Sequence, residues 1–145
     1  MNPWQWTGKL LRECVARRRP AAPQLLRALN RTRGTLLAAR LEVADSGPAR
    51  SKGLLGRAGL AAGQGLWIVP CESVHTFFMR FAIDLVYLDR KNRVRKVRSG
   101  VGPWRLSACF SAHSVLELPE QTIHNTRTER GDTLAFEPAA AEDTR

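Results

Sequence analysis

The sequence predicts an all-β fold, a small antiparallel β-barrel-like domain with one or two short helices, and an α+β arrangement is the alternative. Many short apolar runs have the length of strands, and turn signals recur between them roughly every 8–12 residues, a spacing typical of sandwiches and barrels. Only one or two short segments have helical character. With 145 residues, 43% of them hydrophobic, the chain is long enough for one domain with its own core.

The expected elements follow one another between these turn signals. A turn at 45–48 leads into a short helix expected over 49–56, and residues 119–129 are expected to form a loop or a helical turn. Residues 89–92 link two strands and mark the clearest hairpin. The expected strands are Thr35–Val43, Leu66–Pro70, Val74–Met79, Ile83–Leu88, Arg93–Arg98, Val115–Leu118 and Thr133–Phe136.

The formal net charge of +10 is distributed unevenly along the chain. Residues 1–34 hold eight Lys and Arg against Glu13 alone, so we expect a basic N-terminal arm there, a barrel-like domain over 35–137 and a flexible tail over 138–145. An arm of this kind can be attracted to an anionic surface, although its charge does not specify which one.

The sequence also bears on the location of the protein. No run approaches the roughly 20 apolar residues of a membrane span. Arg12 and Glu13 interrupt the apolar residues near the start, where a secretory signal would need a continuous stretch. The expected location is therefore cytoplasmic, with peripheral membrane association through the arm as an alternative.

Polar residues within apolar strands define a candidate ligand site, because such residues usually have specific partners. On the strand expected over 83–88, the side chain of Asp84 points to the face opposite that of Ile83 and Leu85. A carboxylate there requires either a cation or backbone donors, and the expected cation is Arg80 or Arg57. The site would bind a small polar ligand or a protein segment at the barrel rim, and the alternative is an internal ion pair that fixes strand register. The candidate ligand-binding residues are Arg57, His75, Arg80, Asp84, Trp104 and Arg105.

The cysteines and histidines allow a second interpretation, a thiol- or metal-dependent enzyme. Cys71 and His75 are candidates for a nucleophile with its base, because a base lowers the pKa of a thiol. A buried cysteine beside a hydrogen-bonded histidine is the competing interpretation. Cysteine and histidine are ligands that suit zinc or copper, and the spacing Cys-x3-His occurs twice. The candidate metal ligands are therefore Cys71, His75, Cys109 and His113. From the sequence we assign no catalytic residue, no metal and no cofactor.

The cations of the hairpin do not predict specific nucleic-acid binding. Six of them lie within residues 90–98, and no aromatic residue is interleaved with them. Surfaces of the OB type combine cations with stacking aromatic rings. Contact with phosphates alone would be nonspecific and sensitive to salt.

Several motifs in one order resemble the domain-of-unknown-function 192 family over residues 35–137. The opening motif is Arg50-Ser51-Lys52-Gly53-Leu54-Leu55-Gly56-Arg57, followed by Leu60, Gly63 and Gly65-Leu66-Trp67. The middle motif is Cys71-x-x-x-His75-Thr76-Phe77-Phe78-Met79-Arg80, followed by Ile83-Asp84-Leu85 and Leu88-Asp89. The remaining motifs are Pro103-Trp104-Arg105, Val115-Leu116-Glu117-Leu118-Pro119 and Gly131-Asp132.

The resemblance implies a small bacterial or archaeal domain, largely β and barrel-like, without a settled biochemical activity. Residues 1–34 lie outside the resemblance, and Leu55 stands where a methionine is common in the family. Many relatives look exported, whereas we expect no signal peptide here. A third interpretation is therefore an accessory scaffold that the basic arm brings to an envelope-associated assembly.

Overall fold

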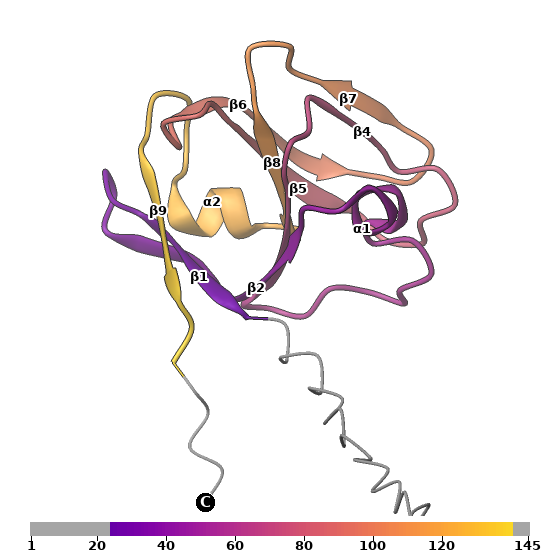
Figure 1. The fold of residues 1–145 in the computed structure, drawn as a ribbon, viewed down its shortest axis with the longest axis horizontal. Helices are drawn as coiled ribbons and strands as arrows, with labels where there is room; N and C mark the ends of the chain where they lie inside the picture. Colours follow the sequence, from indigo (N-terminus) through magenta and orange to yellow (C-terminus); the bar gives the residue numbers. More distant parts are fainter. Residues whose placement is uncertain (1–23, 141–145) are drawn as a thin grey trace, which may run out of the picture.

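The structure is a computed structural model that describes residues 24–140, and the expected arm and tail lie partly outside these residues. Seven strands form one sheet in the order β6-β5-β8-β3-β2-β1-β9, while β4 and β7 form a separate two-stranded ribbon (Figure 1). The strands are β1 (Leu26–Asn30), β2 (Thr35–Ala44), β3 (Gln64–Ile68), β4 (Ser73–His75), β5 (Ile83–Leu88), β6 (Val94–Val101), β7 (Leu106–Ala108), β8 (Ser114–Pro119) and β9 (Leu134–Pro138). The helices are α1 (Gly47–Lys52) and α2 (Thr122–Thr126). The all-β prediction is confirmed.

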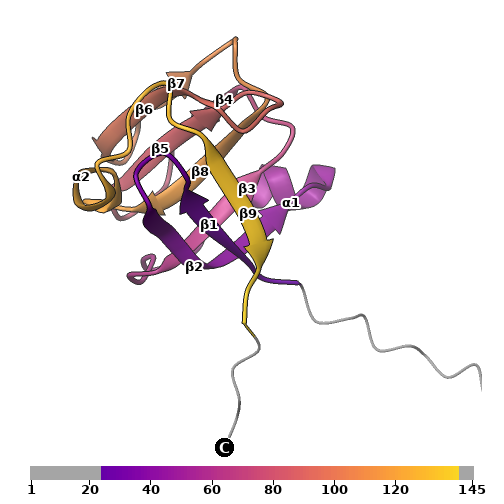
Figure 2. The same cartoon turned by 90° about the vertical axis from the view of Figure 1, so that its left-hand side faces the viewer.

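The large sheet curls until its two edges meet, as the turned view in Figure 2 illustrates. β6 and β9 stand at opposite ends of the strand order, yet an isolated bridge joins Arg93 to Thr133. The backbone N–H of Leu134 also donates to the carbonyl of Asn92 over 2.9 Å. The predicted barrel-like architecture is therefore present, with the contact between the edges limited to the start of β6 and the start of β9. Within residues 24–140, no helix is long and apolar enough to span a bilayer.

One strand pair differs from the predicted antiparallel arrangement. β2 and β3 run parallel, whereas the other pairs are antiparallel. Parallel neighbours need a crossover connection, and the segment of residues 45–63, which contains α1, provides it. This crossover carries α1 to the side of the sheet where the candidate site lies.

α1 begins and ends at residues with clear capping roles. Ser46 accepts a hydrogen bond from the backbone N–H of Ala49 over 3.3 Å, and Pro48 lies in the first turn, so the helix begins before the predicted residue 49. Gly53 has a φ of 47°, a conformation that glycine adopts readily, and it ends the helix before the predicted residue 56.

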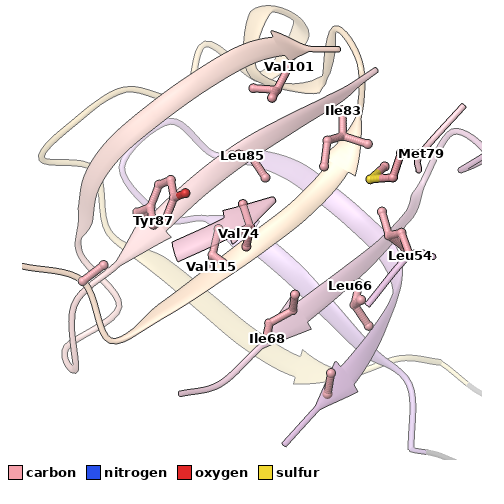
Figure 3. Packing of buried hydrophobic residues seen from close by; sticks show 12 residues of the cluster. Leu54, Leu66, Ile68, Val74, Met79, Ile83, Leu85, Tyr87, Val101 and Val115 are labelled. Atoms are coloured by element: carbon pink, nitrogen blue, oxygen red, sulfur yellow. The ribbon is translucent and has the colours of Figure 1, made fainter. Parts of the chain in front are cut away.

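β5 and β8 are buried on both faces and separate two hydrophobic clusters. Successive side chains of a strand point to opposite faces. The first cluster, whose side chains Figure 3 shows, includes Leu54 after α1 and Val74 of β4, so it lies beneath α1 and the ribbon. The second cluster includes Ile123 of α2 and lies on the opposite face. From β5 and β8, the first cluster receives Ile83, Leu85, Tyr87 and Val115, and the second receives Val86, Leu88, Leu116 and Leu118.

The strand predicted over 74–79 is shorter in the structure, because β4 ends at His75. The buried Thr76 hydroxyl donates to the backbone carbonyl of Gly102 in the β6–β7 connection over 2.7 Å, and Phe78 has a φ of 64°. A positive φ breaks the alternation of a strand. Met79 is therefore buried in the first cluster, whereas His75, the last residue of β4, is exposed.

Two strands were not predicted. β1 pairs with both β2 and β9, so the sheet begins inside the residues assigned to the basic arm and before the expected boundary at residue 35. Arg27 interrupts its apolar residues, which hides the strand pattern. β7 has three residues and pairs with β4. A strand of this length shows no periodicity that a sequence can reveal.

Asp84 is fully buried, and its partners differ from the expected cations. One carboxylate oxygen accepts the backbone N–H of Gly100 over 2.9 Å, and the other accepts that of Ile123 over 2.8 Å. Backbone donors, one of the two kinds of partner expected from the sequence, therefore hold Asp84 in place of Arg80 or Arg57. Asp84 thus connects β5 to Gly100 of β6 and to the start of α2. Without its carboxylate, the backbone N–H groups of Gly100 and Ile123 would have no acceptor.

Replacing Asp84 by alanine should lower the free energy of unfolding by about 2–3 kcal/mol, because two donors lose their acceptor. Urea unfolding measures this difference. Asp45→Ala is the control, because Asp45 is exposed and its loss should change stability by less than about 0.5 kcal/mol. Unchanged stability of Asp84→Ala would contradict a structural role.

Candidate functional site

Glu117 of β8 places a carboxylate inside the first hydrophobic cluster. It shares a face of β8 with Val115, and it lies between Leu66 of β3 and Leu85 of β5 in the cross-strand register. Both leucines are nearly or fully buried members of that cluster, and Glu117 itself is 4% exposed. The side chain is therefore surrounded by apolar neighbours along the sheet.

The Glu117 carboxylate lacks the contacts that normally stabilise a buried charge. Its Oε2 atom has no hydrogen-bond partner among the described residues. Burial raises the pKa of Glu117 to about 7, and the positive charge of Arg57 opposes this shift only in part. A buried carboxylate without donors is costly, so this group marks either a local instability or a position where another molecule supplies the donor.

Arg57 is held by another carboxylate. Its guanidinium makes two hydrogen bonds to Glu42 of β2, of 3.1 and 2.8 Å. This pair raises the pKa of Arg57 and lowers that of Glu42. Two parallel hydrogen bonds fix the plane of an arginine, so Arg57 stays engaged with Glu42 while acting on Glu117 only as a nearby charge.

A cavity of about 240 Å³ opens beside Glu117, between α1, β4 and the face of the large sheet that carries the first hydrophobic cluster. Its walls include members of the first cluster that Figure 3 labels, namely Leu54, Ile68, Val74 and Met79. Its polar and cationic lining comprises Arg50, Ser51, Lys52, Cys71, Ser73 and His75. The carboxylate of Glu117 is the one acidic group among these described lining residues.

Gly53 lies next to the carboxylate. A Cβ atom built on this glycine would stand 3.9 Å from Glu117 Oε2, which is ordinary contact distance. The positive φ of Gly53 is the feature that disfavours other residues there. The motif that ends α1 therefore brings the backbone close to the buried carboxylate.

Cys71 lines this cavity but is poorly suited to act as a nucleophile. Burial raises the pKa of its thiol, and the negative charge of Glu117 acts in the same direction. Its Sγ donates to the carbonyl of Ser73 over 3.1 Å. A thiol held in its neutral form is a weak nucleophile at neutral pH. The cavity brings Cys71 and His75 to the same space, as the dyad hypothesis required, without activating the cysteine.

The four candidate metal ligands do not form one cluster. Across residues 24–140, no group of three His, Cys, Asp or Glu side chains is arranged to hold a metal ion. Cys71 lies in the cavity with His75, whereas Cys109 approaches the hydroxyl of Ser111 at 3.5 Å. The backbone carbonyl of His113 accepts the N–H of Cys71 over 2.8 Å, which is a structural contact between the two loops.

The remaining candidate ligand-binding residues form a different surface. His75 stacks on Phe77 with ring centroids 4.9 Å apart, and Trp104 lies 5.6 Å from Phe77 and 4.7 Å from Phe78. Arg105 follows Trp104, and its backbone N–H donates to the buried Thr76 hydroxyl over 2.9 Å. We call these rings, together with Leu106, which pairs with His75 across the ribbon, the aromatic surface; it comprises His75, Phe77, Phe78, Trp104 and Leu106.

The residues predicted to form one ligand site at the barrel rim thus lie in several separate parts of the structure. Arg57 and Arg80 line a separate hollow beside Phe78. His75 alone connects the cavity to the aromatic surface. Asp84 projects to the opposite face of the sheet, toward α2.

Glu117 was not predicted as a site residue from the sequence. The available signal was the same one that drew attention to Asp84, a carboxylate within an apolar strand. In the sequence the two residues look alike. Their different surroundings arise from contacts with segments far away in the chain.

The protein is a small β domain with a pocket on one face of its curled sheet. α1 and the ribbon cover this pocket, and the carboxylate of Glu117 lies at its base. The model of the family DUF192, described as "Uncharacterized ACR", matches residues 28–136. The chain belongs to this family, as the motifs predicted.

Curated relatives include a UPF0127 protein of Thermococcus sibiricus, which is 29% identical over 115 residues that cover 75% of this chain and 73% of the relative. A UPF0127 protein of Thermococcus gammatolerans is also 29% identical over 115 residues, covering 75% and 74%.

Solved structures share the fold. A candidate transcription regulator of Sinorhizobium meliloti matches with a TM-score of 0.69 at 19% identity, covering 79% of this chain and 94% of that one. A protein of unknown function from Novosphingobium aromaticivorans matches with a TM-score of 0.65 at 18% identity, covering 77% and 83%. At these identities the likeness concerns the fold alone.

Replacing Glu117 by glutamine should change how stability depends on pH. The folded state holds the pKa of Glu117 at about 7, above the ordinary value near 4.3, so it binds an extra proton between these values. Relative to Glu117→Gln, the wild-type free energy of unfolding should therefore fall by about 3 kcal/mol as pH rises from about 4 to about 8, and stay level above that.

Urea unfolding of both proteins across this range measures the effect. Glu120→Gln is the control, because Glu120 is exposed on the segment that follows β8. A wild-type-minus-variant difference that does not depend on pH would contradict the raised pKa.

Proposed function

We propose that the protein binds a small polar ligand in the cavity between α1, β4 and β8, and that Glu117 makes the innermost contact. One observation carries this proposal. Glu117 lines a cavity of about 240 Å³, and its buried Oε2 atom has no partner within residues 24–140. Ligand pockets commonly combine apolar walls with a few polar groups that orient the ligand.

The size of the cavity restricts the ligand. A water molecule takes up about 30 Å³, so a cavity of about 240 Å³ has room for a ligand of roughly eight water-sized groups. This is below the usual range for drug-sized ligands. The ligand would therefore be a small metabolite that offers a hydrogen-bond donor to the carboxylate.

The protonation state of Cys71 favours a binding function over the alternative of a thiol-dependent enzyme. Its raised pKa keeps the thiol neutral at physiological pH. The cavity also lacks a described base with a hydrogen bond to Cys71 Sγ, since the contact of that atom is to the backbone carbonyl of Ser73. A nucleophilic cysteine requires the reverse, an activated thiolate.

A panel of small probes should include molecules that stabilise the wild-type protein. The panel comprises ethanolamine, β-alanine, γ-aminobutyrate, acetamide, acetate and inorganic phosphate, assayed by thermal shift and then by calorimetry. We expect at least one probe to bind and Glu117→Gln to weaken it about tenfold or more, because hydrogen bonds to a charged group are strong.

The matched control is Glu120→Gln, which should bind like the wild type. Failure of every probe to bind, or equal binding by Glu117→Gln, would overturn the proposed pocket.

A second candidate function is peripheral contact with an anionic membrane through the aromatic surface. Phe78 is 74% exposed, Trp104 56% and Leu106 69%. Clustered exposed apolar side chains usually mark an interaction surface, and tryptophan beside arginine is typical of membrane interfaces. The exposed Arg80 and Arg105 supply positive charge next to these rings.

Phe78 and Trp104 are held in place by backbone geometry. Both have positive φ values, of 64° and 60°. Such conformations are uncommon for bulky residues and persist where surrounding contacts impose them. The backbone N–H of Trp104 donates to the carbonyl of Thr76 over 3.0 Å, which is one such contact.

Flotation with phosphatidylglycerol/phosphatidylcholine vesicles tests this second candidate. Phe78→Ser/Trp104→Ser should reduce the bound fraction about tenfold, since both rings lose their transfer into the interface. Leu36→Ser on β2 is the matched control, at a leucine that is 43% exposed. Since every variant keeps residues 1–34, equal flotation of all proteins would exclude the aromatic surface as the contact.

A further inference from the structure

We propose that the ligand of the Glu117 cavity is a small zwitterion whose ammonium group enters first and whose carboxylate stays at the mouth. This inference rests on the proposed function and specifies its ligand class. It is carried by the opposite charges at the two ends of one cavity.

The inner end is negative and enclosed. Glu117 lies between Leu66 and Leu85 on the sheet, and its Oε2 atom has no hydrogen bond in the described structure. An ammonium group is a compact cation with several donors. It would supply both the missing hydrogen bond and the missing countercharge, which a neutral donor supplies only in part.

The mouth of the cavity is positive. Arg50 and Lys52 lie in the last turn of α1 and His75 at the end of β4, and the exposure of Lys52 and His75 puts this end of the cavity at the protein surface. Arg50 donates to the backbone carbonyl of Asp45 over 2.7 Å, which leaves its charge uncompensated by that contact. A ligand that carried a positive charge alone would be repelled on entry by these residues.

An anionic ligand fits the mouth but not the inner end. Its negative group would either stop at Arg50 and Lys52 and leave Glu117 without a donor, or meet the Glu117 carboxylate directly. Like charges at close range are unfavourable in a medium of low polarity. Apolar residues such as Leu54 and Met79 line the cavity, so a short aliphatic stem between the two charges matches its walls.

The charged groups around Glu117 determine how this binding should depend on pH. β3 and β5 contribute the leucines beside it, while the segment after α1 contributes Arg57, which is paired with Glu42 of β2. α1 contributes Arg50 and Lys52, and the chain from Pro70 to β4 contributes Cys71 and His75. Among these, Glu117 is the group whose pKa burial raises to about 7.

Ammonium binding requires ionised Glu117, so the carboxyl proton is released to solvent when the zwitterion binds. Affinity should therefore rise as pH increases from 6 to 8, over which range the ammonium and carboxylate of an ω-amino acid keep their charges. An anionic ligand that bound the protonated acid would show the opposite trend.

The test uses calorimetry on the full chain with glycine, β-alanine, γ-aminobutyrate and 5-aminopentanoate. For the tightest of these, the N-acetyl form and the carboxamide form remove one charge each. We expect each capped form to bind at least tenfold more weakly, and we expect affinity to increase several-fold from pH 6 to pH 8, with proton release measured in two buffers of different ionisation enthalpy.

Variants assign these effects to residues. Glu117→Gln should abolish the pH dependence, whereas His75→Gln should keep it. Lys52→Gln should weaken the zwitterion but not its carboxamide form, and Lys91→Gln, an exposed cation outside this cavity, is the matched control.

The outcomes separate this inference from the proposed function. If a capped cation or a capped anion binds as tightly as the zwitterion through Glu117, the ligand class is overturned and the pocket stands. If affinity falls with rising pH, the ligand class is likewise overturned. If neither the zwitterions nor the other small probes bind in a Glu117-dependent manner, the pocket itself is overturned.

Discussion

The double-sided burial of β5 and β8 is the constraint on which the rest of the structure depends. Side chains on either face of these strands enter a hydrophobic cluster, so a polar residue there must find a partner or bear the cost of burial. Asp84 and Glu117 stand on these two neighbouring strands and point to opposite faces. One carboxylate accepts two backbone donors, and the other has none in the described structure.

The difference between these carboxylates follows from what covers each face. The α2 side presents a backbone N–H at Ile123, which comes close enough to bond Asp84. The opposite face is covered by α1 and the ribbon, which approach the sheet through apolar side chains such as Leu54 and Val74. This cover leaves a cavity at Glu117 and presents cations at its mouth. The result is a pocket with separated charges.

His75 relates the pocket to the aromatic surface. It lines the cavity and also stacks on Phe77, whose ring contacts Trp104. The buried Thr76 hydroxyl, which bonds backbone groups from the β6–β7 connection, holds the two strands of the ribbon together near this point.

Much of the architecture followed from local sequence. The apolar run of residues 83–88 was assigned correctly because it combines β-branched and aromatic residues between turn signals. The family was also evident, because several motifs occur in a fixed order. β1 was missed because Arg27 interrupts its pattern, and the extent of β4 was overestimated because the positive φ of Phe78 has no sequence signal in an apolar run.

The sequence by itself determined that two carboxylates, Asp84 and Glu117, lie within apolar strands. Only the tertiary structure decided which carboxylate is satisfied, since the donors to Asp84 come from Gly100 and Ile123, far away in sequence. It also decided that Glu117 faces a cavity, because the parallel crossover between β2 and β3 places α1 over that face of the sheet. Burial and hydrogen bonding depend on packing between distant segments, and periodicity along one strand reports only which face a side chain occupies.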